Sequence, residues 1–280
     1  MTNTRAAYFG AAAAAAVAAP VVIGIGYLAL RALRDASGAL STARLLRVLG
    51  ERAVWQAFGW SLYTAAAATA LALAAAVGTA VLLRGRTPFD RAARTLAVLP
   101  LPVPHLVAAA LGVLVLAQSG LAARALVAAG LVPMIADAPA LIYDRAGIGV
   151  ILVLAWKEFP FLGLLASTIL AQRGTALEEA ARTLGATPWQ SFRHVTWPTL
   201  RRGLAPAVIA VFTFAAGCYE IAVLLGPSDP LPFPVLLYER HTDASLATRA
   251  DADVLALLAV LAALIAVGWH EWARRRAESR

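Results

Sequence analysis

Two adjacent charged residues, Lys157 and Glu158, lie inside an apolar stretch that reads IGVILVLAWKEFPFLGLLAST. The pair stands about ten residues from the start of the stretch, which places it near the middle of a membrane at about 1.5 Å of rise per helical residue. Charges at that depth are costly and usually face the protein interior or a cavity. Two interpretations are open: a polar site on a path through the membrane, or structural contacts with other polar groups.

Three further polar residues are candidates for the same path. His105 follows a stretch with prolines at 100, 102 and 104, which cannot continue a regular helix. Irregular backbone within a membrane is expected only where protein or a water-filled cavity covers it. Tyr219 and Glu220 lie toward the outer end of another apolar stretch and are candidates for the wall of an outer cavity. Core packing or an ion pair explains them equally well.

The sequence offers little for catalysis or metal binding. A nucleotide-binding P-loop needs a lysine in a glycine-rich loop, and the only lysine is Lys157. The hydrolase motifs H-E-x-x-H and G-x-S-x-G are missing from the sequence. Cys218 is the single cysteine, which excludes an intrachain disulfide and a multi-cysteine metal site. The histidines are scattered, at His105, His194, His241 and His270. We predict no catalytic residue, no metal site and no cofactor bound by this chain.

The composition identifies an integral membrane protein. Hydrophobic residues make up 61% of the chain, against about 45–50% in a soluble domain, and the mean hydropathy is +0.74. Residues 6–30, 53–83 and 95–123 carry no charge, and about 20 apolar residues suffice to cross a bilayer. The net charge of +8 comes from arginines at the ends of these runs, where they anchor spans. No basic face with interleaved aromatics is present, so nucleic-acid binding is not expected.

We therefore predict an all-α polytopic membrane protein, a single domain over residues 1–280. Its six spans are predicted at 8–30, 58–83, 95–118, 147–171, 204–226 and 252–270. With the N-terminus inside, the inward segments carry more arginines than the outward ones, so both termini are predicted to be cytoplasmic. The basic stretch 31–52 weakens this bias and is predicted to lie on the outer surface as an amphipathic helix. The apolar piece 125–136 is too short to span and is predicted to cover the outer mouth.

A polar segment, residues 173–203, joins the fourth and fifth predicted spans. Thr175 with Glu178 fits a capping box at a helix N-terminus, and Gly185 stands where the helix C-terminus needs a positive φ. Thr187-Pro188-Trp189-Gln190 then starts a second helix, with a threonine cap, proline at the first position and glutamine at the third. That second helix is predicted to end before Pro198. The segment is thus predicted to be a helix–turn–helix hairpin.

The hairpin has two interpretations. A docking element for a partner would need two rigidly capped helices, whereas a flexible linker would not. The small residues Ala180 and Ala181 permit close approach, and Trp189, Phe192 and Val195 lie roughly on one helical face. An amphipathic loop packed on its own spans remains the alternative.

The hairpin also carries a resemblance to a known family. Its motif has fixed spacing and consists of Glu179, Ala180, Ala181, Gly185, Val195 and Pro198. It resembles the EAA loop of inner-membrane permease subunits of binding-protein-dependent, type I ABC importers, and the wider resemblance covers roughly residues 58–270. In such permeases the first helix of the loop is a coupling helix. The resemblance implies that Glu179, Ala180, Ala181 and Gly185 contact a separate ATPase, and that residues after Gly185 seat the loop.

The resemblance also implies partners and a location. These are two ATP-binding subunits that carry ATP and Mg²⁺, a second permease subunit in a homodimer or heterodimer, an extracytoplasmic substrate-binding protein, and the lipid of a bacterial inner membrane. An ion-gradient-driven secondary transporter is the alternative, since Lys157 and Glu158 suit such a role, but it leaves the capped hairpin unexplained. An intramembrane enzyme is a third possibility, which the missing motifs disfavour.

Overall fold

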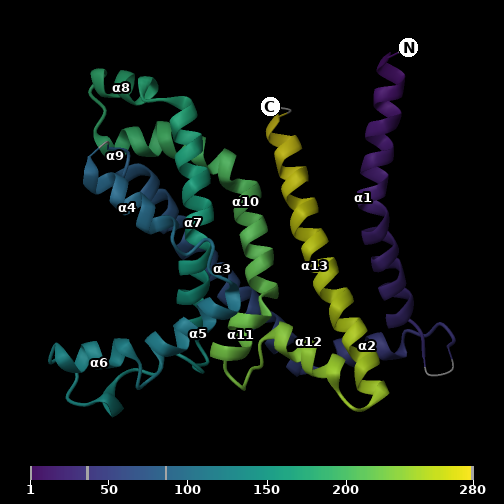
Figure 1. Ribbon diagram of the computed structural model, residues 1–280. Helices are drawn as coiled ribbons and strands as arrows, with labels where there is room; N and C mark the ends of the chain where they lie inside the picture. Colours follow the sequence, from purple (N-terminus) through teal and green to yellow (C-terminus); the bar gives the residue numbers. More distant parts are fainter. Residues whose placement is uncertain (1, 36–37, 86, 279–280) are drawn as a thin grey trace. The chain divides into compact units, whose positions relative to one another are not determined.

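The computed structural model describes residues 2–35, 38–85 and 87–278, and these form α-helices with short connections and no β-strand (Figure 1). The chain divides into two compact units. The smaller unit comprises the chain up to Trp55 together with Leu236–Trp269, and the larger comprises Gln56–Val235 together with the C-terminal residues from His270. The single domain expected from the sequence remains a prediction.

The larger unit contains both candidate sites, namely the hairpin over residues 173–203 and the charged pair Lys157 and Glu158. Its elements are most of α3 (Arg52–Leu82), α4 (Pro88–Val98), α5 (His105–Leu116), α6 (Leu121–Ala128), η1 (Ile135–Asp137), α7 (Ile148–Arg173), α8 (Ala176–Thr183), α9 (Pro188–Ser191), the π-helical turn η2 (Phe192–Thr196), α10 (Trp197–Gly217) and α11 (Tyr219–Leu225). Helix α7 has 26 residues, so it is about 39 Å long. Helices α8 and α9 lie at one end of α7, and α5 and α6 lie at the other (Figure 1).

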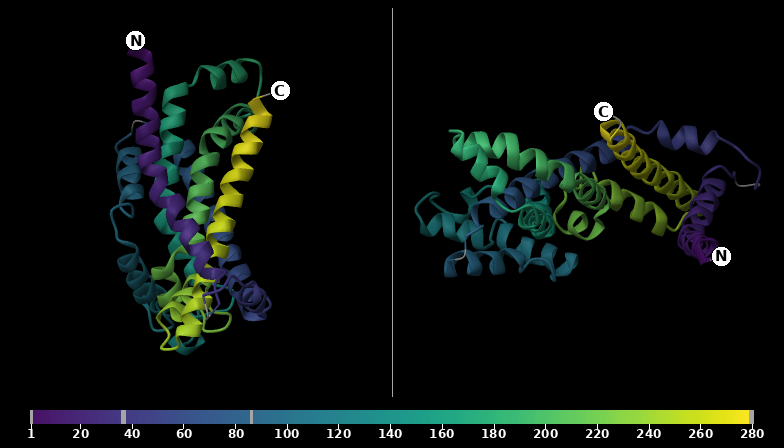
Figure 2. Two further views of the ribbon diagram at one scale, coloured as in Figure 1. Left: turned by 90° about the vertical axis from the view of Figure 1, so that its right-hand side faces the viewer. Right: turned by 90° about the horizontal axis from the view of Figure 1, so that it is seen from above.

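The core of the larger unit is built from small and branched apolar residues. Helix α7 packs against α10 and α5, and α11 packs against α5 (Figure 2). Leu154, Leu162, Leu200 and Leu204 are fully buried. Gly203 lets α10 approach α7 closely, because an added Cβ would lie 2.6 Å from the Ile169 side chain. Small residues at helix contacts are typical of membrane proteins, where close backbone approach supplies the packing energy.

Six helical stretches of the described chain are long and apolar enough to cross a membrane, as predicted. They are Ala12–Ala32, Arg52–Leu82, His105–Ala128, Ile148–Arg173, Pro188–Gly217 and Leu246–Arg276. The third span was predicted ten residues too early, because the prolines between 100 and 104 separate α4 from α5. The fifth starts earlier than predicted and its helix breaks at Cys218, so 218–226 is not a continuation of α10.

Both predicted surface segments are shorter helices than expected. Among the described residues between the end of α1 and the start of α3, only α2 (Ala43–Leu49) is helical. The piece predicted over 125–136 begins earlier, as α6, and ends at Ala128. A separate 3₁₀ turn, η1, follows it.

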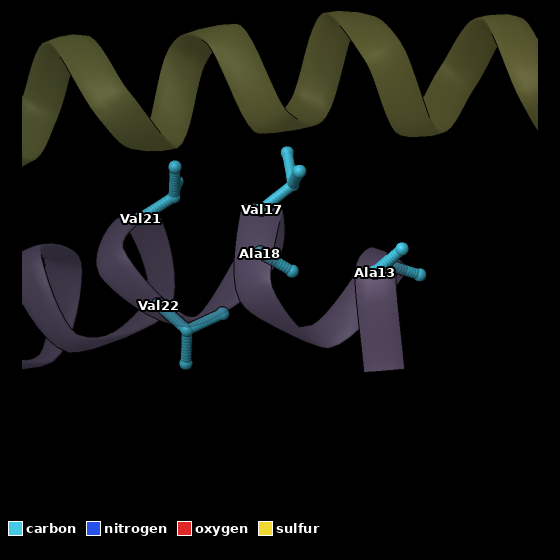
Figure 3. Close-up of a pocket in the computed structure, with 6 residues that line it drawn as sticks. Ala13, Val17, Ala18, Val21 and Val22 are labelled. Carbon is cyan, nitrogen blue, oxygen red and sulfur yellow. The ribbon is translucent and has the colours of Figure 1, made fainter. Parts of the chain in front are cut away.

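The smaller unit joins α1 (Thr2–Ala32), α2, the last part of α12 (Phe233–Thr242) and most of α13 (Leu246–Glu278). Two buried acids at the start of α13 hold the N-terminal helices: Asp253 pairs with Arg31 at 3.0 Å and Asp251 with Arg47 at 2.5 Å. Residues 12–24 of α1 are exposed. Figure 3 shows Val17 and Val21 on the side of α1 that points toward α13.

Candidate functional site

The hairpin predicted from the sequence is present, and its first helix ends as expected. Helix α8 ends at Thr183, Leu184 is its C-cap, and Gly185 follows with φ +86°. The Gly185 amide donates to the Arg182 carbonyl at 2.9 Å, and the Ala186 amide donates to the Ala181 carbonyl at 3.0 Å. These two bonds form a Schellman motif, which satisfies carbonyls that the helix end would otherwise leave unpaired. Gly185 therefore fixes the direction in which the chain leaves α8.

The second helix begins as predicted but does not end as predicted. Thr187 caps α9, its hydroxyl accepts from the Gln190 amide at 3.3 Å, and the Gln190 side chain accepts from the Thr187 amide at 2.8 Å. The helix then continues into α10 through Pro198, which occupies the first turn of α10. The π-helical turn η2 ends at Thr196, two residues before this proline. Because the backbone remains helical from Pro188 to Gly217, the hairpin is continuous with the fifth span.

The capping box predicted for Thr175 and Glu178 is wrong. The Thr175 side chain makes no cap hydrogen bond to the backbone and instead donates to the Glu179 carboxylate at 2.6 Å. Glu178 faces away from the helix start: its carboxylate accepts from Arg84 at 2.5 Å and from the Thr196 hydroxyl at 2.6 Å. Sequence reasoning missed Arg84 and Thr196, because local spacing does not reveal partners that are 94 and 18 residues away.

Glu178 therefore joins three elements. It connects α8 to Arg84, just beyond the end of α3, and to Thr196, the last residue of η2. Burial alone would raise the pKa of the Glu178 carboxyl, but the hydrogen bonds from Arg84 and Thr196 outweigh it and lower the pKa. The carboxylate is thus ionised at neutral pH. Its contribution is lost only as the pH falls through the lowered pKa.

The surface of the hairpin presents apolar side chains to solvent. Leu184 is 89% exposed and Trp189 is 66% exposed, and the Trp189 ring stacks on Phe192 with centroids 5.5 Å apart. Glu179, Ala180 and Gly185 are exposed, whereas Ala181, Val195 and Pro198 are half-buried. A cavity of about 350 Å³ beside α8 is lined by charges of both signs, Arg84, Arg182, Glu178 and Glu179. The hairpin thus combines exposed apolar side chains with a charged recess, which suits a protein partner.

The charged pair in the fourth span contacts the proline-rich segment. Lys157 is buried, and its ammonium group donates to the Leu101 carbonyl at 3.3 Å. The Glu158 carboxylate lies 3.1 Å from the His105 Nε2. The His105 ring lies 4.8 Å from the ring of Phe214 on α10. As helix geometry predicts, Lys157 and Glu158 find different partners. Leu101 lies in the break between α4 and α5, and His105 is the first residue of α5.

These contacts are the ones expected if Lys157 and Glu158 have a structural role. A carbonyl freed by the prolines needs a donor within a membrane, and the Lys157 ammonium group provides one for Leu101. The role of Lys157, Glu158 and His105 in a path through the membrane stays a prediction. Tyr219 and Glu220 open α11 rather than continuing α10, and exposed Glu220 accepts from the Cys218 thiol at 3.8 Å.

Residues 68–278 match the family described as the inner membrane component of binding-protein-dependent transport systems. A probable sulfate transport permease, cysT of Nephroselmis olivacea, is 29% identical over 46% of this chain and 46% of its own length. The sulfate transport permease CysW of Synechocystis is 36% identical over 40% of this chain and 42% of its own. The chain thus spans less than half the length of these relatives.

A solved structure shares the fold. It is the crystal structure of a bacterial alginate ABC transporter in complex with an alginate pentasaccharide-bound periplasmic protein. One of its chains superposes with a TM-score of 0.73 at 17% identity, over 98% of this chain and 94% of that one.

Proposed function

The chain belongs to the family of inner-membrane components of binding-protein-dependent transport systems, and we propose that it is the permease subunit of an ABC importer. It forms half of a solute pathway, and ATP hydrolysis on another subunit drives it. The observation that carries this proposal is the hairpin between α7 and α10, whose first helix ends in a Schellman motif and whose second begins with a capping box. Family membership favours this function over ion-gradient-driven transport.

The hairpin would act as the coupling element. In this proposal α8 docks on the ATPase through Glu179, Ala180, Ala181 and Gly185, while the exposed Leu184 enters an apolar depression of the partner. Glu179, Ala180 and Gly185 are exposed and the half-buried Ala181 is small, which supports close approach.

Movement of α8 would pass directly into the membrane helices. Glu178 connects α8 to Arg84 next to α3 and to Thr196, which directly precedes α10. Charge-assisted hydrogen bonds of this kind are stronger and shorter than neutral ones. A displacement of α8 by the ATPase therefore pulls on two spans at once, and alternating opening of the pathway follows from their rearrangement.

The proposed complex contains further subunits. Two ATP-binding subunits carry ATP and Mg²⁺, a second permease subunit completes the pathway, and an extracytoplasmic binding protein delivers the solute. The similar proteins are named for different solutes, sulfate and alginate, so we propose no particular solute. The location that fits is a bacterial inner membrane, with both termini and the hairpin in the cytoplasm.

Cysteine accessibility tests this arrangement. In a Cys218→Ala background, single cysteines at Arg182 and Arg276 are expected to resist a membrane-impermeant thiol reagent in intact cells. Cysteines at Asp137 and Asp243 are expected to react. After the cells are lysed, all four should react, which controls for burial. Labelling at Arg182 from outside would place the hairpin on the wrong side for an ATPase and overturn the proposal.

A further inference from the structure

A second recess lies on the hairpin side of the larger unit, between the end of α7 and the first turns of α10. Its volume is about 280 Å³. Three basic side chains line it, Arg173, His194 and Arg202, and no acidic residue is among the described residues that do so. Leu177 and Pro198 complete the wall with apolar surface. The recess thus offers positive charge next to hydrocarbon.

The basic groups are held in place by the fold. Arg173 donates to the Thr199 hydroxyl at 3.3 Å, and that hydroxyl in turn donates to the Val195 carbonyl at 3.0 Å. The His194 Nδ1 lies 2.9 Å from the Gln190 carbonyl, which can only accept, so Nδ1 carries the proton of this bond. Two of the three basic side chains are therefore oriented by contacts with α10 and the hairpin.

The recess lies at the level where lipid headgroups are found. Arg173 directly follows the uncharged residues 159–172, and Arg202 directly precedes the uncharged residues 203–219. Arginines that flank apolar runs in this way sit at the membrane surface. Basic pockets between spanning helices on the cytoplasmic side bind the headgroups of anionic lipids.

We propose that this recess binds the phosphate group of an anionic phospholipid. Arg173 and Arg202 contact the phosphate oxygens, His194 adds a third polar contact, and Leu177 and Pro198 lie against the glycerol and the first acyl carbons. The cytoplasmic location of this site rests on the orientation proposed above, whereas lipid binding does not require importer activity. It sits beside the hairpin, so an occupied recess would stabilise the junction of α7 with α10.

Native mass spectrometry of the full-length protein tests the proposal. The protein is released from micelles that contain equal amounts of palmitoyl-oleoyl phosphatidylglycerol and palmitoyl-oleoyl phosphatidylcholine, and the retained lipids are counted. The wild type is expected to retain phosphatidylglycerol preferentially. Arg173→Gln and Arg202→Gln are each expected to reduce that preference about fivefold, the effect of about one cation near an anionic surface.

The double variant Arg173→Gln, Arg202→Gln is expected to lose more of the preference than either single variant. Its matched control is the double variant Arg193→Gln, Arg201→Gln, which removes the same two charges from exposed positions that do not line the recess. It is expected to keep the wild-type preference, and equal loss in both double variants would overturn the site. If inorganic phosphate displaces the bound phosphatidylglycerol, the recess is a site for free phosphate, and the proposal of a lipid ligand is overturned. An unchanged lipid preference in Arg173→Gln, Arg202→Gln, combined with lost association of an ATPase, would assign the recess to protein docking instead.

Discussion

The Gly185→Val variant is expected to insert into the membrane at normal abundance and to lose ATPase association and solute uptake. Gly185 has φ +86° and its amide closes the Schellman motif of α8. A left-handed conformation costs an L-residue about 1–2 kcal/mol, and a β-branched side chain tolerates it least. The turn would open, and α8 would no longer be presented in one orientation.

The expected loss of uptake in Gly185→Val comes from backbone strain and not from steric crowding. Apart from Gly185 itself and its two neighbours in the chain, no described residue has an atom within 4 Å of the position that a Cβ would take there, so the added side chain has room. Gly185→Asn is the matched control, because asparagine adopts positive φ more readily than other non-glycine residues. Uptake per folded protein should follow the order glycine, asparagine, valine. Normal uptake by Gly185→Val at equal abundance would contradict the role of α8.

The second large effect is expected at Lys157. Lys157→Met removes the donor to the Leu101 carbonyl, and a hydrogen bond that involves a charged group contributes about 1.5–3 kcal/mol. We expect a clearly lower melting temperature of the purified protein. Glu158→Gln should cost less, because an amide still has an oxygen to accept from His105 and only the charge is lost.

Two readouts separate the structural role from a role in the pathway. If the contacts are only structural, the melting temperature falls while solute-stimulated ATP hydrolysis per folded complex is unchanged. If Glu158 and His105 also line the pathway, Glu158→Gln changes that hydrolysis or the range of solutes at a nearly normal melting temperature. A Lys157→Met protein as stable as the wild type would contradict the contact with Leu101.

The six spans were predictable because the uncharged runs are long and the membrane imposes one helix length. The boundaries of the third and fifth spans were less so. The prolines between 100 and 104 were recognised as irregular, yet the span was still predicted to begin at residue 95. Pro198 was taken as a stop, although proline is well tolerated in the first turn of a helix.

Local patterns predicted the hairpin caps that depend on neighbouring residues, and failed where a distant residue competes. Thr187, Gln190 and Gly185 behave as their spacing indicates. Glu178 has the right spacing for a cap at Thr175, but Arg84 and Thr196 bind its carboxylate instead. A hydrogen bond to a charged residue that tertiary folding brings close is stronger than one to a backbone amide at an exposed helix end. The sequence around Glu178 gives no sign of that residue.

The account centres on docking of an ATPase at the hairpin, and cross-linking from α8 measures this most directly. A photoreactive benzoylphenylalanine replaces exposed Ala180, the membranes of the producing cells are irradiated, and the attached protein is identified by mass spectrometry. The same probe at exposed Leu261 of α13 is the control. We predict that position 180 captures an ATP-binding subunit and that position 261 does not. Failure of position 180 to capture any ATP-binding protein, in membranes that retain uptake, would contradict the account.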